Sequence, residues 1–551
     1  MTTADVGPVP VAGTAAAKKK PLMGPVRVQL EAFGVAILGA VLMKWLCLEA
    51  FQIPTSSMQP TLMGSNEAGV YDRILVDKLL PAIREPKRWD ITVFKYPLQK
   101  NQNYVKRLGG MPNDRLTIGG GNLWQVSDGE GGKRTYQIER KPADLQEQMW
   151  KNVFPGRMHA RSETKCLGQV LGTSPPRAFS EDENGITAEL DGRALLFFRD
   201  EADGGMVDRV WDGYPEEVAR AIREKTPHDQ PQEIVPDVRI AATVTAAQTL
   251  DELAFEIEVA RPNFETWTYA LMIKGGKANL QVRAKDKVLG HSEESTLTIA
   301  PGSAVEIAFA HVDAELVAWR DGRELLRFKS DDWECRDGCV LPYSPGKLQF
   351  PANQKVTPQI VARGKGRLHL GELRIDRDQH YVRSGAPEII EVPDGHYYML
   401  GDNTLQSVDS RGWTAVTIGV DADDNVVPPD TPGARVVRGN KRPMSLANPP
   451  DRDETPIPIP GEKALVMIDE YGEILRLKAT VSSTWPRVAF SPPNPQDGRG
   501  EWEAPDTTNT KGISFVPRAD IQGRAVMIFY PARPFAWLSG NAWPGRFGFV
   551  R

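Results

Sequence analysis

The sequence predicts a mainly β protein with several domains. Its 551 residues include 44 prolines and 49 glycines, which interrupt long helices and favour short strands joined by turns. Short segments of alternating or continuous apolar residues recur along the chain, as at 238–245, 253–259, 305–310 and 368–375, and this pattern is typical of strands. A chain of this length can bury two or three separate cores.

Composition and spacing argue against several classes of partner and cofactor. The net charge of −5 provides no basic field, so we expect no nucleic-acid partner. None of the seven histidines pair at a spacing such as His-Glu-x-x-His, so we expect no metal and no other cofactor. Cys335 and Cys339 are close enough in sequence to form a small disulfide loop outside the cell, or to remain unpaired, and the sequence leaves both possibilities open.

The N-terminal residues predict a membrane anchor. Residues 1–29 contain a run of three lysines and are expected to form a disordered basic tail in the cytoplasm. Residues 30–53 are largely apolar and, as a helix of roughly 36 Å, would span a hydrocarbon core of about 30 Å. Because positive residues precede this segment, we expect a single pass through the cytoplasmic (inner) membrane, with the N-terminus inside and the remaining chain outside. A cleavable signal peptide is the alternative, but Leu48-Glu-Ala50 has a large residue where cleavage requires a small one.

Hydroxyl side chains follow directly after this apolar segment, in the run Ile53-Pro-Thr-Ser-Ser-Met58. A serine is a weak nucleophile until a base accepts its proton, and a lysine can act as that base when burial keeps its amine neutral. Strands are predicted at 89–97 and 103–110, and the second contains Lys106 among apolar neighbours. Each segment taken alone is more typical of an ordinary turn and of a solvated strand lysine.

Five segments in order resemble the motif boxes of bacterial signal peptidase I. They are residues 53–62, 71–79, 88–97, 104–114 and 401–413. The resemblance covers roughly residues 30–125, 386–413 and 513–551. It implies a membrane-bound serine endopeptidase that removes N-terminal signal peptides from exported preproteins and cuts after small residues, in Ala-x-Ala sites.

The resemblance also implies a role for individual residues. The nucleophile falls on Ser57 and the general base on Lys106, and the oxyanion hole would consist of the Ser57 N–H and the Thr55 hydroxyl. Ser407 would orient the Lys106 amine. Small side chains of the substrate would be accepted by apolar pockets, and the pocket residues expected from position are Ile53, Leu62, Tyr104 and Val105.

Two further residues of the last box, Asp409 and Arg411, would form an ion pair that supports the site. An ordinary surface pair is the alternative for them, and such a pair contributes little to stability. Residues 404–406, Thr-Leu-Gln, depart from the charged and amide residues usual there. Any ion pair made by those three positions is therefore in doubt.

The resemblance divides the chain into peptidase segments and insertions. The peptidase domain is expected at 54–126, 384–416 and 511–551, interrupted by a mixed insertion at 127–235, a β-sandwich at 236–383 and a loop-rich insertion at 417–510. The run 316–326, with Asp321-Gly322 as its turn, is similar to a hairpin of a concanavalin or laminin-G-like sandwich. This likeness identifies no ligand, so the partner of the sandwich is unknown.

A catalytically silent, membrane-tethered binding protein is the competing interpretation. Such a protein would keep the peptidase scaffold and use the inserted sandwich for binding. It would have no physical need for a serine and a lysine at positions 57 and 106, or for a serine at 407. Because all three are present, the enzyme is favoured.

Overall fold

The computed structural model of the chain describes residues 25–66, 68–97, 99–129, 134–157, 165–199, 205–215, 218–220, 233–260, 265–285, 287–329, 355–383, 386, 388–413, 416–427, 431–441, 457–458, 464–469, 471–478, 515–530 and 548–550. These residues are mainly β, as the sequence predicts. Most of the expected basic tail and the pair Cys335 and Cys339 lie outside the described residues. The chain divides into two units, residues 1–49 and residues 50–551.

The first unit contains helix α1, Pro25–Leu46. Large apolar side chains are exposed along its first half, at Val28, Leu30, Phe33, Val35, Ile37 and Leu38. Among the described residues, no helix combines the length and the apolar character needed to cross a membrane. The expected helix over 30–53 is also wrong at its end, because residues Leu48–Gln52 form strand β1, which is next to β4 (Arg73–Asp77) in a sheet.

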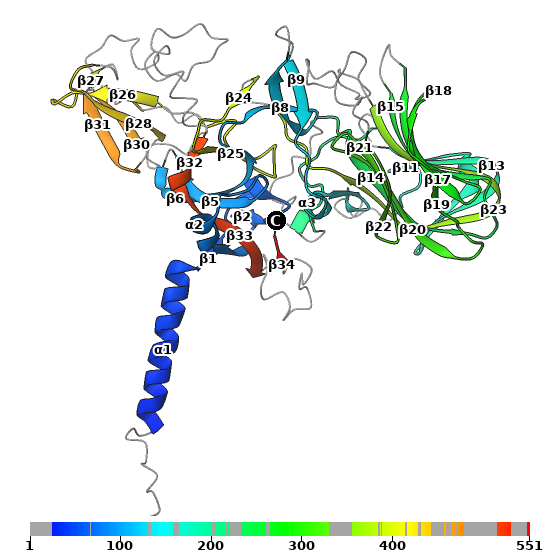
Figure 1. Cartoon of the computed structure of the whole chain (residues 1–551), viewed down its shortest axis with the longest axis horizontal. Helices are drawn as coiled ribbons and strands as arrows, with labels where there is room; N and C mark the ends of the chain where they lie inside the picture. Colours follow the sequence, from blue (N-terminus) through cyan, green and yellow to red (C-terminus); the bar gives the residue numbers. More distant parts are fainter. Residues whose placement is uncertain are drawn as a thin grey trace, which may run out of the picture. The chain divides into compact units, whose positions relative to one another are not determined.

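An antiparallel sheet of eight strands brings together three distant stretches of sequence. Its order is β1-β4-β33-β5-β6-β25-β32, with β34 beside β33. The further bounds are β5 Ile91–Tyr96, β6 Gln99–Gly110, β25 His396–Leu400, β32 Phe515–Pro517, β33 Ile521–Tyr530 and β34 Gly548–Phe549. The strands expected at 89–97 and 103–110 are thus β5 and β6. Because β33 pairs with both β4 and β5, residues Ile521–Tyr530 complete a sheet whose first strand begins at Leu48 (Figure 1).

Two smaller sheets and two short helices belong to the same region. A four-stranded sheet has the order β24-β7-β8-β9 and a hairpin is formed by β2 and β3. The bounds are β2 Gly64–Ser65, β3 Val70–Tyr71, β7 Arg115–Gly119, β8 Asn122–Asp128, β9 Arg134–Ile138, β24 Ile390–Glu391, α2 Leu79–Ile83 and α3 Ala143–Met149. The boundary expected at residue 126 falls inside β8, which pairs with β9 on the other side of it.

The residues expected to form the insertions contribute to a sheet of 14 strands. Its main path is β18-β17-β16-β15-β23-β14-β20-β21-β22. The bounds are β14 Val238–Ala246, β15 Glu252–Ala260, β16 Trp267–Lys274, β17 Lys277–Ala284, β18 Lys287–His291, β19 Ser295–Thr296, β20 Ala304–Val312, β21 Glu315–Arg320, β22 Arg323–Phe328 and β23 Lys355–Arg377. The four strand segments expected between 238 and 375 are confirmed, and so is the hairpin turn, where Asp321 and Gly322 both have positive φ.

Part of the mixed insertion at 127–235 belongs to this same sheet. Strands β10 Lys151–Phe154 and β13 Gly185–Phe198 pair with β23, and β11 Leu171–Ser174 and β12 Phe179–Asp182 pair with β13. The two insertions share a sheet because β23 is long enough to pair with β10 and β13 as well as with β14 and β15.

Strands from the two ends of this sheet contact each other. Strand β17 contacts both β21 and β22, although several strands separate them in the hydrogen-bonded order (green in Figure 1). A shared hydrophobic core includes residues of β13, β14, β15, β17, β20 and β23. The sheet therefore curves over its own apolar face, which removes that face from water.

The expectation of a loop-rich segment at 417–510 needs correction for its described part. Residues between 416 and 478 contain a sheet of six strands, β26 Val416–Val420, β27 Val426–Val427, β28 Arg435–Lys441, β29 Ile457–Pro458, β30 Ala464–Asp469 and β31 Ile474–Lys478. Short runs of apolar residues, such as those of β26, bury side chains at Ile418 and Val420. The frequent prolines concealed these runs.

Candidate active site

The residues around Ser57 form a tight turn that is anchored in the core. Ser56–Met58 make one turn of 3₁₀ helix, in which Gln59 N–H donates to the Ser56 carbonyl at 3.1 Å. The Met58 side chain is 1% exposed and packs with Ile53 and strands of the eight-stranded sheet. Because the neighbouring Met58 is buried, the orientation of Ser57 is fixed by packing and not only by the turn.

Lys106 lies on β6, opposite Thr92 of β5, and its side chain is buried. Burial disfavours the charged amine and is the largest influence on the Lys106 pKa, which falls from 10.5 to about 8. Asp409 opposes this effect, Arg411 reinforces it, and Asp402 opposes it to a smaller degree. An amine with such a pKa can lose its proton near neutral pH.

A cavity of about 520 Å³ brings Ser57 and Lys106 together. Two segments supply most of its lining: the turn that carries Ser57, here called the nucleophile turn, and part of β6. Two more residues come from the 401–413 loop. The lining residues are Gln52, Ile53, Pro54, Thr55, Ser56, Ser57, Met58, Gln102, Asn103, Tyr104, Val105, Lys106, Gln406 and Val408. The candidate nucleophile, base and oxyanion residue therefore share one cavity. Three of the four predicted pocket residues line it as well.

The fourth predicted pocket residue, Leu62, is placed elsewhere. Its side chain is fully buried in the core beneath the turn and is not among the cavity residues. Position in the motif could not distinguish these outcomes, because an apolar side chain suits a pocket wall and a core equally well.

In this part of the chain no hydrogen bond joins the Ser57 hydroxyl to the Lys106 amine, and the Thr55 hydroxyl does not cap the turn.

Ser407 is packed against the backbone of the same site. A Cβ at Gly401 would lie 2.0 Å from Ser407 Oγ and 2.6 Å from the Ser57 carbonyl oxygen. The Ser407 hydroxyl oxygen is buried and has no hydrogen-bond partner among the described residues. Gly401 is therefore the reason why the serine can approach the nucleophile turn so closely.

Asp409 and Arg411 form a buried bidentate pair and not an ordinary surface pair. Arg411 Nε donates to Asp409 Oδ1 at 2.8 Å and Nη2 donates to Oδ2 at 2.7 Å. Burial alone would raise the Asp409 pKa, but Arg411 and the hydrogen bonds, including one from the Gly401 N–H, keep this pKa below its usual value. Arg411 also donates to the Val382 and Thr404 carbonyls, so the pair fixes the 401–413 loop.

A second buried pair, between Arg107 and Asp402, was missed by the sequence analysis. Arg107 donates from Nε and Nη2 to the two carboxylate oxygens of Asp402 at 2.8 and 2.7 Å, and Thr61 Oγ1 donates to the same carboxylate at 2.5 Å. Neighbouring residues of a strand point to opposite faces, so Arg107 faces away from the side on which Lys106 lies.

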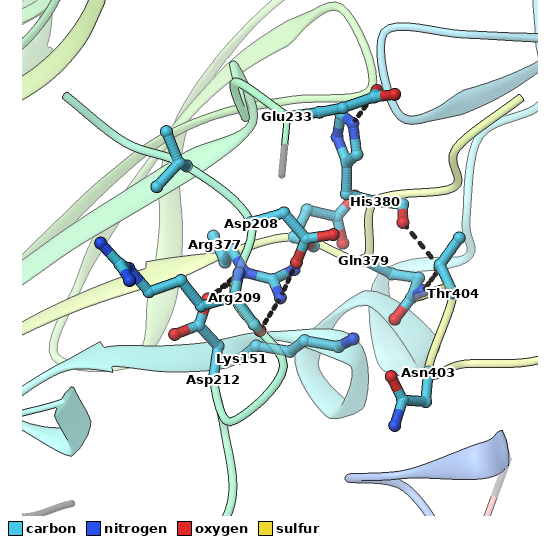
Figure 2. Close-up of polar contacts among 12 residues, drawn as sticks. Lys151, Asp208, Arg209, Asp212, Glu233, Arg377, Gln379, His380, Asn403 and Thr404 are labelled. Atoms are coloured by element: carbon cyan, nitrogen blue, oxygen red, sulfur yellow. Dashed lines mark hydrogen bonds and ion pairs between the residues drawn. The ribbon is translucent and has the colours of Figure 1, made fainter. Parts of the chain in front are cut away.

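The carbonyl oxygen of Asp402 accepts two further hydrogen bonds. They come from Lys151 Nζ at 2.9 Å and from Gln379 Nε2 at 2.9 Å. Gln379 also donates to the Thr404 hydroxyl, which donates in turn to the His380 carbonyl (Figure 2). Burial lowers the Lys151 pKa to about 8, with Arg377 acting in the same direction. None of these contacts gave a signal in the sequence.

Three buried carboxylates lie close together away from the cavity. Asp237, Asp313 and Asp378 have oxygens within 4.8 Å of one another. The Lys141 ammonium lies 2.5 Å from Asp313 and 2.8 Å from Asp378, and His311 lies 3.0 Å from Asp237. Lys141 therefore pairs with two of the three carboxylates, and His311 contacts the third.

The segments that build the cavity are similar to known signal peptidases. The family described as signal peptidase, peptidase S26, matches residues 26–159 and 352–427. Signal peptidase I of Pseudomonas aeruginosa is 41% identical over 96 residues, covering 15% of this chain and 31% of the relative. Signal peptidase I of Buchnera aphidicola subsp. Acyrthosiphon pisum is 36% identical over 99 residues, covering 16% and 30%. The chain thus spans about a third of the length of these curated relatives.

Solved structures resemble this chain only weakly. A carbohydrate-binding module, CBM66, from Bacillus subtilis covers 38% of this chain and 98% of its own, with 7% identity and a TM-score of 0.23. A Bacillus licheniformis β-glucanase covers 37% of this chain and 83% of its own, with 8% identity and the same TM-score. Scores this low give no information on the fold or on a ligand.

The family match includes both halves of the cavity. Ser57 and Lys106 lie in its first segment, and the loop with Ser407 and the Asp409–Arg411 pair lies in its second. These segments of the chain are therefore similar to signal peptidase I, and the resemblance found in the sequence is confirmed.

Proposed function

We propose that the chain is a membrane-bound serine endopeptidase that removes N-terminal signal peptides from exported preproteins. The observation that carries the proposal is that Lys106, buried and with a pKa of about 8, lines the same cavity as Ser57. A solvated strand lysine would have an ordinary pKa and would be protonated at neutral pH. The similarity to signal peptidase I supports the choice of substrate.

The neutral Lys106 amine is the general base of the proposed reaction. With a pKa of about 8, roughly one amine in ten is neutral at pH 7, compared with about one in 3,000 for an ordinary lysine. The amine accepts the proton of the Ser57 hydroxyl while the serine oxygen attacks the scissile carbonyl carbon. Ser407 is proposed to orient this amine. The buried Ser407 hydroxyl oxygen has no hydrogen-bond partner among the described residues and can therefore accept a hydrogen bond from it.

The negative charge that develops on the carbonyl oxygen needs hydrogen-bond donors at a fixed position. The Ser57 N–H and the Thr55 hydroxyl are the proposed donors, and both residues line the cavity. Losing one donor of this kind costs about 100- to 1,000-fold in rate. Lys106 then returns its proton to the leaving amine, and a water molecule hydrolyses the acyl-enzyme in a second step of the same kind.

The apolar wall of the cavity favours small side chains in the substrate, in an Ala-x-Ala pattern. Ile53, Tyr104 and Val105 supply this wall. Gln406 and Val408 are additional cavity residues from the 401–413 loop. Because Gln406 stands where the family usually has a different residue, it is the position at which we expect the substrate preference of this chain to differ.

Helix α1 is proposed to attach the chain to the cytoplasmic membrane. The support is the run of exposed apolar side chains on this helix, such as Phe33 and Ile37, which is costly in water. Deleting residues 1–46, which leaves β1 intact, should move the protein from the membrane fraction to the soluble fraction. Retention of the shortened chain on membranes would contradict this placement.

We also propose that residues 236–383, together with β10–β13, form a sandwich. The contacts of β17 with β21 and β22 support the sandwich. No ligand is indicated by any described contact, so this part of the proposal concerns architecture alone. Small-angle scattering of residues 139–383 would test it through the compactness of that fragment.

Cleavage of a preprotein with an Ala-x-Ala site by the detergent-solubilised full chain tests the peptidase proposal. Ser57→Ala and Lys106→Met should each abolish cleavage, and a matched Lys95→Met on β5, an exposed lysine, should not. Unchanged cleavage by either site variant would refute the proposed mechanism. If the unmodified chain does not cleave while a known signal peptidase does in the same assay, the binding-protein interpretation gains.

A further inference from the structure

We propose that Tyr214 is a positioning residue for the nucleophile turn, supplied by an insertion. Residues 205–215 and 218–220, here called the brace segment, lie outside both segments that match the family. Through Tyr214 this segment makes hydrogen bonds to Gln59, which follows the Ser57 turn, and to Asn403 of the 401–413 loop. The inference rests on the proposed peptidase function and gives the insertion a part in it.

The Tyr214 hydroxyl lies between the nucleophile turn and the 401–413 loop. It donates a hydrogen bond to Gln59 Oε1 at 2.5 Å and accepts one from Asn403 Nδ2 at 3.3 Å. The same Asn403 amide donates to the Ser56 carbonyl at 3.1 Å, and the Asn403 backbone N–H donates to the Ser57 carbonyl at 3.1 Å. Tyr214 thus links the residue after the nucleophile turn to the loop that holds the turn from the other side.

Burial makes this hydroxyl a dependable donor. Tyr214 is 7% exposed, and burial is the largest influence that raises its pKa above the ordinary value. The phenol therefore keeps its proton throughout the pH range in which the peptidase would work. Removing the hydroxyl would leave the side-chain oxygen Oε1 of Gln59, a buried residue, without this donor.

Apolar contacts place the brace segment under the hairpin that follows the nucleophile turn. Tyr214, Val218 and Ala219 form one buried cluster with Met63 and Val70. Met63 immediately precedes β2 and Val70 begins β3. Apolar packing of the brace segment therefore supports the chain directly after the nucleophile turn, and this packing does not depend on the hydrogen bonds of Tyr214.

Ion pairs anchor the brace segment to the inserted sheet. Asp212 accepts from Arg157 at 2.7 and 2.8 Å and from Arg377 Nε at 2.5 Å, and Arg377 also pairs with Asp208 (Figure 2). Burial would raise the Asp212 pKa, but the two guanidinium groups lower it to about 2. Because Arg377 ends β23, the segment that carries Tyr214 is fixed to the longest strand of the 14-stranded sheet.

Tyr214 acts through other residues and not on the substrate. It is absent from the cavity lining, which contains Ser56, Ser57 and Met58 of the turn. A serine that must attack a carbonyl carbon loses rate steeply with displacement, by up to about 100-fold for 1 Å. The brace segment is therefore expected to influence the rate of the chemical step more than substrate binding.

The test compares Tyr214→Phe with Tyr398→Phe in the full chain. Tyr398 is a matched control, since it is also buried and its hydroxyl has no hydrogen-bond partner among the described residues. With an Ala-x-Ala preprotein, Tyr214→Phe should lower kcat about tenfold, with KM changed less than twofold, whereas Tyr398→Phe should change neither. Hydrogen–deuterium exchange of residues 53–64 should be faster in Tyr214→Phe only.

A double-variant cycle separates positioning from general destabilisation. Gln59→Met removes the partner of the same hydrogen bond, so the double variant with Tyr214→Phe should be less than twofold slower than the slower single variant. If the rate losses of the two single variants multiply in the double variant, the shared role of Tyr214 and Gln59 is overturned. An increase in KM with kcat unchanged would overturn it as well.

The proposed function and the positioning role fail in different ways. Cleavage by the unmodified chain that is lost in Ser57→Ala establishes the peptidase without reference to Tyr214, and equal kcat in Tyr214→Phe then refutes only the positioning role. If no preprotein is cleaved, the exchange measurement decides, and unchanged exchange of residues 53–64 in Tyr214→Phe refutes the inference.

Discussion

Raising the pH from 6 to 9 should increase kcat/KM for preprotein cleavage about 90-fold. The reason is that only the neutral Lys106 amine can accept the serine proton, and kcat/KM reports the groups of the free enzyme. With a pKa of about 8, the neutral fraction rises from about 1% at pH 6 to about 9% at pH 7 and about 90% at pH 9. The rate should therefore rise nearly tenfold per pH unit below pH 7.5 and level off above pH 8.5.

This magnitude follows from the surroundings of the amine. Lowering the Lys106 pKa from 10.5 to about 8 corresponds to about 3 kcal/mol against the charged form. Loss of hydration by burial supplies most of this free energy, and the Arg411 guanidinium adds to it. The carboxylates of Asp409 and Asp402 act in the opposite direction and prevent a larger shift.

Initial rates on a peptide substrate with an Ala-x-Ala site and no group titrating between pH 6 and 9 would give the profile, with Ser57→Ala as the background. An ordinary lysine base would give an increase of about 1,000-fold with no plateau, and a histidine base with a pKa near 6.5 only about fourfold. A profile of either kind would refute the assignment of a buried Lys106 as the base.

Two further predictions concern the 401–413 loop. Asp409→Asn leaves the buried Arg411 guanidinium without its anionic partner and should lower the free energy of unfolding by about 3–5 kcal/mol, measured by urea titration. The control Glu189→Gln comes from an exposed pair and should lower this free energy by less than about 1 kcal/mol. Equal losses in the two variants would contradict the reasoning. Gly401→Ala adds a Cβ 2.0 Å from a neighbouring hydroxyl and should slow cleavage at least about tenfold, whereas Gly412→Ala, with nothing within 4 Å, should not.

The sequence by itself determined the local elements and the pair of residues proposed for the chemistry. Strands β5 and β6, the four inserted strand segments and the Asp321-Gly322 turn follow from patterns a few residues long. Ser57 and Lys106 could be identified because the motif boxes keep a fixed order along the chain. Such signals are local, since propensity and turn chemistry act between near neighbours.

Only the tertiary structure decided which side chains are buried and what they contact. Leu62 was expected in the pocket and lies in the core, because hydrophobicity does not distinguish the two positions. Arg107 and Asp402 are 295 residues apart and Tyr214 and Gln59 are 155 apart, so no local pattern could pair them. These partners meet because distant strands pair in common sheets, and buried polar groups then require the hydrogen bonds and charges that the packed chain places beside them.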